Sequence, residues 1–187
     1  MKKTTEHTAT DVIADTAAEA ITLLHAVSAE QVADAIKIAG CSVTTLEHNG
    51  VPHLHSASQG VGFQVLWGNA AAASGQFVDF TLSCPLRVQD GVLPEGLIAE
   101  WHRSKRFARI VQHGDLLALE MDVIVVGGVS TAHLNMMVQL WTQMMGQFFV
   151  HLRNFAPAAP VAGTPTVGSN QEAVPATAAP QEASAVV

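Results

Sequence analysis

The chain has 187 residues and a formal net charge of −7 at pH 7, and only 13% of its residues are charged. This length favours one domain with a tail, and about 130 to 150 folded residues can bury a core without disulfides or metal ions. The acidic balance argues against a nucleic-acid partner, because neutralising phosphates requires a broad basic face.

The two cysteines, Cys41 and Cys84, lie near apolar residues of the sequence. Two isolated cysteines make no disulfide framework, so we expect buried free thiols. The residues that follow Met1 lack the apolar run of a secretion signal, and we therefore expect a cytoplasmic protein.

The segment between Asp122 and Arg153 contains no Asp, Glu, Lys or Arg, as a membrane span would. However, amide side chains recur in it at helical spacing, at Asn135, Gln139, Gln143 and Gln147. Uncompensated amides are costly in lipid, so we predict a helix that does not insert into a membrane.

The N-terminal part is predicted to open with a flexible stretch, residues 1–10, and to continue with two helices. From Asp11 to Ala26, alanines alternate with larger aliphatic residues, which indicates an amphipathic helix. The second helix starts at Ser28, which forms a capping box with Gln31. Its apolar residues recur at helical spacing, and Gly40 supplies the helix stop.

Strands are predicted next, because apolar residues now recur at every second position. Residues 41–56 predict a hairpin around Asn49-Gly50, a pair that favours the positive dihedrals of a tight turn. Residues 61–68 predict a second strand. Residues 76–86 predict a third, in which apolar and polar residues alternate until Pro85 ends the strand.

A short helix is predicted from Pro94 to about Lys105, with Trp101 on its apolar face and expected in the core. A strand over residues 107–112 follows, and Phe107 at its start is also expected in the core. Residues 116–126 then return as an antiparallel strand.

The last predicted element is a long helix. Gly127-Gly128 breaks the preceding strand, and Ser130 caps a helix from Thr131 to about Leu152. This element order predicts an α+β domain over residues 11–153, with helices packed on an antiparallel sheet. Residues 154–187 are rich in alanine and proline without periodicity, and we expect a disordered tail.

The C-terminal half carries a recognisable set of residues: Glu100, Trp101, Arg103, Arg106 to Arg109, Leu119 to Asp122, and Gly127 to Val129. In order and spacing these residues make the run from Gly96 to Leu152 resemble the YbjN family, described as "putative bacterial sensory transduction regulators". Ala99 and His102 stand where that family commonly has asparagines. The resemblance implies a fold similar to type III secretion chaperones, which dimerise and bind extended segments of other proteins.

The basic cluster within EWHRSKRFAR, residues 100–109, contains the most concentrated positive charge of the chain. Glu100 stands three residues before Arg103 and suits a surface ion pair. Depending on the turn register, Arg109 meets Glu120 on the returning strand, with Asp122 nearby. We favour a structural salt-bridge network and keep open a site for an anion or an acidic peptide, formed by Arg103, Arg106, Arg109, Glu120 and Asp122.

Three histidines, His48, His53 and His55, bracket the predicted hairpin turn. Three imidazoles are able to hold a transition metal, but this spacing is not specific. A surface face of titratable histidines is the favoured interpretation. No cofactor is predicted.

The long helix has an unusually wide apolar face, and Met137, Trp141, Met144, Met145 and Phe148 lie on it. Helices that cover one side of a sheet need only a narrow apolar stripe. Loss of charge together with enrichment in methionine and aromatic residues is typical of interfaces, although a deeply buried core helix would show the same pattern. With the family resemblance, we predict that these five residues form a partner interface.

No catalytic motif is recognisable, so we expect a protein that is not an enzyme. Our first hypothesis is a cytoplasmic regulatory or chaperone-like protein that binds an unidentified protein partner and forms a homodimer. The alternative is a sensor of a small anion or a metal ion.

Overall fold

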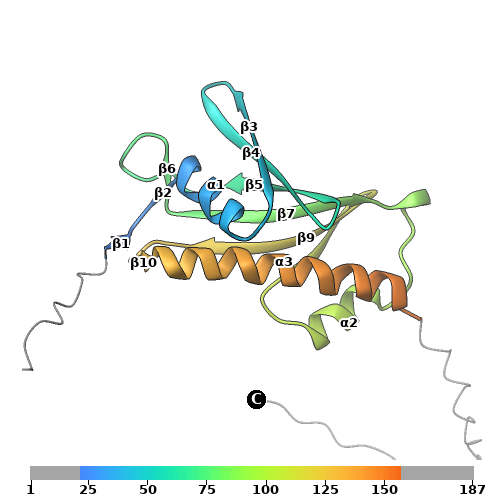
Figure 1. Ribbon diagram of the computed structural model, residues 1–187. Helices are drawn as coiled ribbons and strands as arrows, with labels where there is room; N and C mark the ends of the chain where they lie inside the picture. Colours follow the sequence, from blue (N-terminus) through green and yellow to red (C-terminus); the bar gives the residue numbers. More distant parts are fainter. Residues whose placement is uncertain (1–21, 157–187) are drawn as a thin grey trace, which may run out of the picture. The chain divides into compact units, whose positions relative to one another are not determined.

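The computed structural model describes residues 22–156, which form an α+β fold (Figure 1). The strands and helices follow one another as β1 (Leu23–Leu24), β2 (Val27–Ser28), α1 (Ala29–Ile38), β3 (Ser42–His48), β4 (Val51–Ser58), β5 (Val61–Trp67), β6 (Gln76–Phe77), β7 (Asp79–Arg87), the 3-10 turn η1 (Gln89–Gly91), α2 (Leu97–Ser104), β8 (Arg109–His113), β9 (Leu116–Ile124), β10 (Val129–Ser130) and α3 (Thr131–Asn154). The stretches predicted to be flexible at residues 1–10 and disordered in the tail fall outside the described residues, except for Asn154, which ends α3, and Phe155 and Ala156 after it.

The N-terminal helix prediction is wrong where it can be compared. Residues 11–21 of the predicted helix lie outside the described residues, but Leu23–Leu24 is a strand that pairs with Val129–Ser130. The conformation of this short aliphatic pair therefore depends on a backbone partner more than a hundred positions away. The spacing of apolar residues along the chain could not predict such a partner.

The next helix follows the prediction closely. The Ser28 hydroxyl accepts from the Gln31 N–H at 3.3 Å, and the Gln31 side chain accepts from the Ser28 N–H at 2.9 Å. These two bonds satisfy donors that the first turn of α1 would otherwise leave unpaired. The capping box is confirmed, and Gly40 with a φ of 83° follows the end of α1.

Six strands form the main sheet in the order β3-β4-β5-β7-β9-β8, and every neighbouring pair is antiparallel. The β3–β4 hairpin closes at Asn49-Gly50, where both residues have positive φ, as the two-residue turn requires. β7 and β9 form the longest pairing, from Asp79 opposite Ile124 to Arg87 opposite Leu116. The predicted hairpin and the antiparallel sheet are confirmed.

All three helices pack on one face of this sheet, because their buried residues join one core with alternate residues of the strands. α3 lies along β7 and β9, and α1 packs beside it (Figure 1). The largest side chains that are almost fully buried in this core are Trp101, Trp141, Phe80 and Phe148. In the described part of the chain, no helix covers the opposite face, which we call the open face.

Three predictions about single residues can be compared with the structure. Pro85 does not end its strand, because β7 continues to Arg87. Phe107 is neither core nor strand: it is 61% exposed with a φ of 74°, and β8 begins only at Arg109. Trp101 is fully buried as predicted, and its indole N–H donates to the Ala108 carbonyl at 2.9 Å.

The predicted link into the long helix is confirmed. Gly127 and Gly128 both have positive φ, and the Ser130 hydroxyl accepts from the His133 N–H at 3.1 Å as the N-cap of α3. An added Cβ at Gly128 would lie 2.9 Å from the His25 ring, so this glycine also permits the close approach of β1.

Candidate functional site

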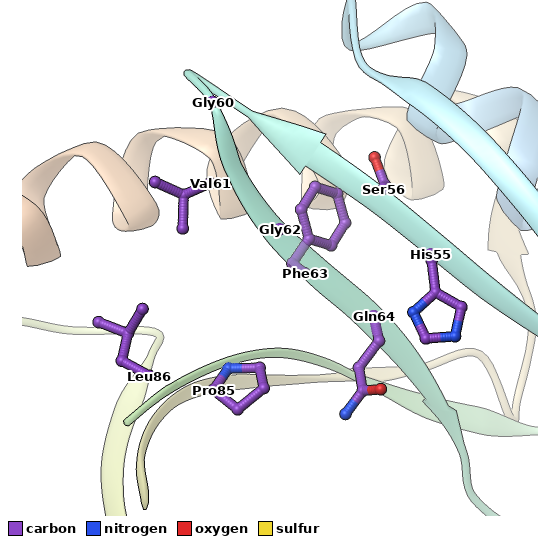
Figure 2. Close-up of a pocket in the computed structure, with 9 residues that line it drawn as sticks. All are labelled: His55, Ser56, Gly60, Val61, Gly62, Phe63, Gln64, Pro85 and Leu86. Carbon is purple, nitrogen blue, oxygen red and sulfur yellow. The ribbon is translucent and has the colours of Figure 1, made fainter. Parts of the chain in front are cut away.

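The main sheet forks between β5 and β7. These two strands pair only from Gln64 opposite Ser83 to Trp67 opposite Phe80. Before Gln64, β5 remains paired with β4 but leaves β7, which stays paired with β9 as far as Arg87. Figure 2 shows β5 running away from the Pro85 and Leu86 side of β7.

Backbone geometry explains why the sheet separates there. The Gly68 N–H donates to the Asp79 carbonyl, so even-numbered residues of β5 direct their backbone groups towards β7. The Val88 N–H donates to Asp115, next to β9, so the odd-numbered residues of β7, including Pro85, face β5. Proline has no N–H to donate, and a continued ladder would lack a bond at this position. The fork is what allows Pro85 to stand within a strand.

An open hollow of about 460 Å³ occupies the fork (Figure 2). Its lining is mostly apolar or small, and it contains no Asp, Glu, Lys or Arg. The lining residues are His55, Ser56, Gly60, Val61, Gly62, Phe63, Gln64, Pro85 and Leu86. The Phe63 ring packs edge-on against Trp141 of α3, with ring centroids 5.7 Å apart, so the hollow stands on the packed core.

A row of polar side chains crosses the open face beside the fork. In the strand register, residues opposite one another run across all six strands as Thr44, His55, Gln64, Ser83, Glu120 and Arg109. His55 and Gln64 also line one end of the hollow. The hollow thus joins an apolar lining to neighbouring hydrogen-bonding groups, as ligand sites commonly do.

Arg109 lies opposite Glu120, which is the register that the sequence suggested. Its guanidinium donates to Glu120 at 2.8 Å and also pairs with Asp122, while the Thr81 hydroxyl donates to Asp122 at 2.6 Å. The hydrogen bond from Arg109, helped by that from Thr81, lowers the pKa of Asp122, although partial burial opposes it. The bond to Asp122 in turn raises the pKa of Arg109.

The other arginines of the cluster do not join this network. Arg103 forms the predicted ion pair with Glu100, and Arg106 lies over the exposed Phe107 ring at 5.1 Å. The structure therefore does not bring Arg103, Arg106 and Arg109 together around one anion, and carboxylates already occupy Arg109.

The hairpin histidines are close to one another without forming a ligand set. The rings of His48 and His53 lie 6.1 Å apart, and His55 stands two residues further along β4. Within residues 22–156, no group of three or more His, Cys, Asp or Glu side chains is placed to hold a metal ion.

Four of the five residues predicted to form an interface lie in the core of the chain itself. Trp141, Met144, Met145 and Phe148 are at most 5% exposed, and Met137 is partly buried against the same core. The α3 residues that stay exposed are others, including Met136 and Val150. Apolar residues at helical spacing identify the buried face of a helix. They do not show whether the same chain or a partner covers that face.

Sequence reasoning missed the fork. The one local sign of the fork is Pro85, which stands inside a strongly alternating strand. From the sequence, this proline predicts the end of the strand and not a fork. Gly62, on the opposite side of the gap, gave no signal of its own, because the pairing that ends beside it involves residues about twenty positions away.

Comparison with known protein families matches residues 28–154 to the YbjN family, described as "Putative bacterial sensory transduction regulator". A comparison with curated proteins finds no significant match. Among the described residues, no helix is both long and apolar enough to cross a membrane.

Proposed function

Because the chain belongs to the YbjN family of bacterial regulators, we propose that it is a non-enzymatic, cytoplasmic regulatory protein that binds an extended segment of another protein. In this proposal the protein is chaperone-like and works as a homodimer. The binding site is the hollow in the fork between β5 and β7.

The fork is the observation that carries the proposal. Val61, Phe63 and Leu86 offer apolar contacts, and the backbone of Gly62 points towards the gap. Extended peptides bind where a strand leaves backbone groups unpaired, and pockets for alternate side chains give specificity. The absence of full charges from the lining favours an uncharged, apolar segment over an ion.

Other features support parts of the proposal. Both cysteines are free thiols, which suits the reducing environment of the cytoplasm. From Thr131 to Leu152, α3 carries no charged Asp, Glu, Lys or Arg, yet it leaves Met136 and Val150 exposed. Surfaces depleted in charge and enriched in methionine are typical of protein contacts.

No specific observation favours the alternative of an anion or metal sensor. The guanidinium of Arg109 is paired with two carboxylates, Glu120 and Asp122. An added anion would have to displace these partners and would meet their negative charge.

Selection of peptides from a random library, displayed on phage and captured by the full chain, tests the proposal. The variant Gly62→Phe should fill the fork. There is room for the larger side chain, because an added Cβ at Gly62 would meet only the Ser56 carbonyl oxygen at 3.8 Å. We expect selected peptides to be apolar and rich in strand-forming residues. Their dissociation constants, measured by calorimetry, should rise about tenfold or more in Gly62→Phe.

Val111→Phe is the matched control, because Val111 lies in the corresponding row of the open face on β8, away from the fork. It should leave peptide binding unchanged, and both variants should keep the circular dichroism spectrum of the parent. A library that yields no binding peptide, or peptides that bind Gly62→Phe as well as the parent, would exclude the fork as the site.

A further inference from the structure

The fork between β5 and β7 is closed at one end. There, Gln64 and Ser83 stand opposite each other, and the two strands become paired neighbours. At the other end, which is open, β5 begins at Val61 after the tight turn at Gln59-Gly60. Figure 2 shows Gly60 and Gln64 at opposite ends of the stretch of β5 that borders the gap. An extended segment that enters the gap therefore meets the paired strands and cannot run straight on between them.

The gap is also short. Successive residues of a strand advance about 3.3 Å, so the stretch of β5 from Val61 to Gln64 spans about 10 Å and accommodates about three extended residues. The middle of a longer chain would have to leave the sheet sharply at Gln64. The end of a chain fills the same gap without a turn. The shape of the fork thus favours a chain end over an internal segment.

The backbone groups that border the gap favour one direction for the bound chain. Gly62 directs both its N–H and its carbonyl towards the gap, whereas Pro85 offers only a carbonyl. β5 is therefore the better partner for a new strand, and antiparallel pairing is slightly more stable than parallel pairing. Because β5 runs from Val61 at the open end to Gln64 at the closed end, an antiparallel partner has its amino end at the closed end.

The groups at the closed end suit an ammonium group better than a carboxylate. The Gln64 amide and the His55 ring, which line this end, each carry an atom that is able to accept a hydrogen bond. A carboxylate requires donors, and Pro85 has no N–H to give. The lining contains no Lys or Arg, and Arg109 in the same row already pairs with Glu120. An ammonium group only donates, so it matches this set of acceptors.

We infer that the fork binds the free amino end of the partner segment, antiparallel to β5, with the ammonium group next to Gln64. This inference rests on the proposed function and names the part of the partner that is recognised. The second residue of the segment lies opposite Gly62, and the first and third lie opposite Phe63 and Val61. Opposite residues point to the same face of a sheet, so the first and third side chains point to the face of Phe63 and Leu86 and should be apolar.

The test uses the full chain and the peptides selected from the display library, with the random residues placed at a free amino end. Each peptide is synthesised with a free amino end, with an acetylated amino end, and with a short Gly-Ser extension before its first residue. Acetylation removes the charge, and the extension meets the paired strands at Gln64. We expect each change to raise the dissociation constant, measured by calorimetry, about tenfold or more. Conversion of the carboxyl end to an amide is the control and should change nothing.

Gln64→Glu tests the position of the ammonium group through a gain of binding, which misfolding cannot produce. A carboxylate at the closed end should lower the dissociation constant of the free amino form about threefold or more and leave that of the acetylated form unchanged. Thr44→Glu is the matched control, because it adds the same charge to the same row of the open face, on β3 and away from the fork. It should leave both dissociation constants unchanged.

The outcomes separate this inference from the proposed function. Equal dissociation constants for the free, acetylated and extended forms would overturn recognition of the amino end, while peptide binding at the fork would stand. Weaker binding of the carboxyl amide alone would reverse the direction of the segment and also overturn the inference. A library without binding peptides, or peptides that bind Gly62→Phe as tightly as the parent, would reject the fork as a peptide site and this inference with it.

Discussion

The two faces of the main sheet are built from the same strands but are held in different ways. On β7 and β9, Leu82 and Met121 point to the helices and are at most 1% exposed, whereas the neighbouring Thr81 and Asp122 point to the open face. The covered face consists of apolar side chains packed around Trp141. On the open face, the hydrogen bond of Thr81 and the ion pairs that join Arg109 to Glu120 and Asp122 remain partly in contact with water.

This difference predicts where the stability of the fold resides. Burial of large apolar side chains contributes several kcal/mol each, whereas exposed ion pairs contribute about 1 kcal/mol or less. Substitutions on the open face should therefore cost less stability than substitutions of buried residues on the covered face. Three measurements sharpen or break this comparison.

The largest effect is expected from Trp141→Ala. Trp141 is fully buried against Phe63, and its removal leaves a cavity that should lower the free energy of unfolding by about 3–5 kcal/mol. Urea unfolding followed by circular dichroism measures it. Trp141→Phe should cost less, because the Nε1 of Trp141 has no hydrogen-bond partner within the described residues and its loss breaks no bond.

Phe107→Ala is the control for an exposed aromatic residue. Phe107 is 61% exposed and contacts Arg106, so its removal should cost less than about 1 kcal/mol. The sequence alone indicates a core position for Phe107 and a partner interface for Trp141. Equal losses of stability in the two alanine variants would contradict the idea that burial sets the contribution of a large aromatic side chain.

The cysteines should differ in reactivity. Burial raises the pKa of Cys84 to about 11, whereas Cys41 is only half-buried. At about pH 8, an aromatic disulfide reagent should modify one thiol quickly and the second about a hundredfold more slowly. The fast reaction should disappear in Cys41→Ser. Two equally fast reactions in the native parent would show that the covered face opens readily.

The smallest effect concerns Asp122 on the open face. The pKa of Asp122 is lower in the folded state, so the unfolded chain takes up the proton first as the pH falls. The stabilisation is present above the carboxyl pKa of the unfolded chain, about 4, and is lost as the pH falls through the folded pKa. Because Asp122 is 47% exposed, we expect at most about 1 kcal/mol.

Urea unfolding at about pH 7 and about pH 3, compared with Asp122→Asn, measures this contribution. The variant should be slightly less stable than the parent at the higher pH and should approach it at the lower pH. An unchanged difference at both values would mean that the ion pair contributes no pH dependence.

Parts of the candidate site were predictable. The position of Arg109 opposite Glu120 could be predicted as one possible register. A short turn joins the two strands, and the register of a hairpin depends on few residues. The hollow was not predictable, since it arises where β5 leaves β7. The contacts that decide this lie between residues distant in sequence, and a single proline was the one local sign of it.

The sequence by itself determined the elements whose signals are local. Ser28 with Gln31, Asn49 with Gly50, and Ser130 at the start of α3 act through bonds within a few positions, so each specified its helix start or turn. The tertiary structure decided what depends on distant partners. It made Leu23–Leu24 a strand, left Phe107 exposed, kept Pro85 within β7 and enclosed Trp141 within its own chain, because burial and strand pairing are set by segments that meet only when the chain folds.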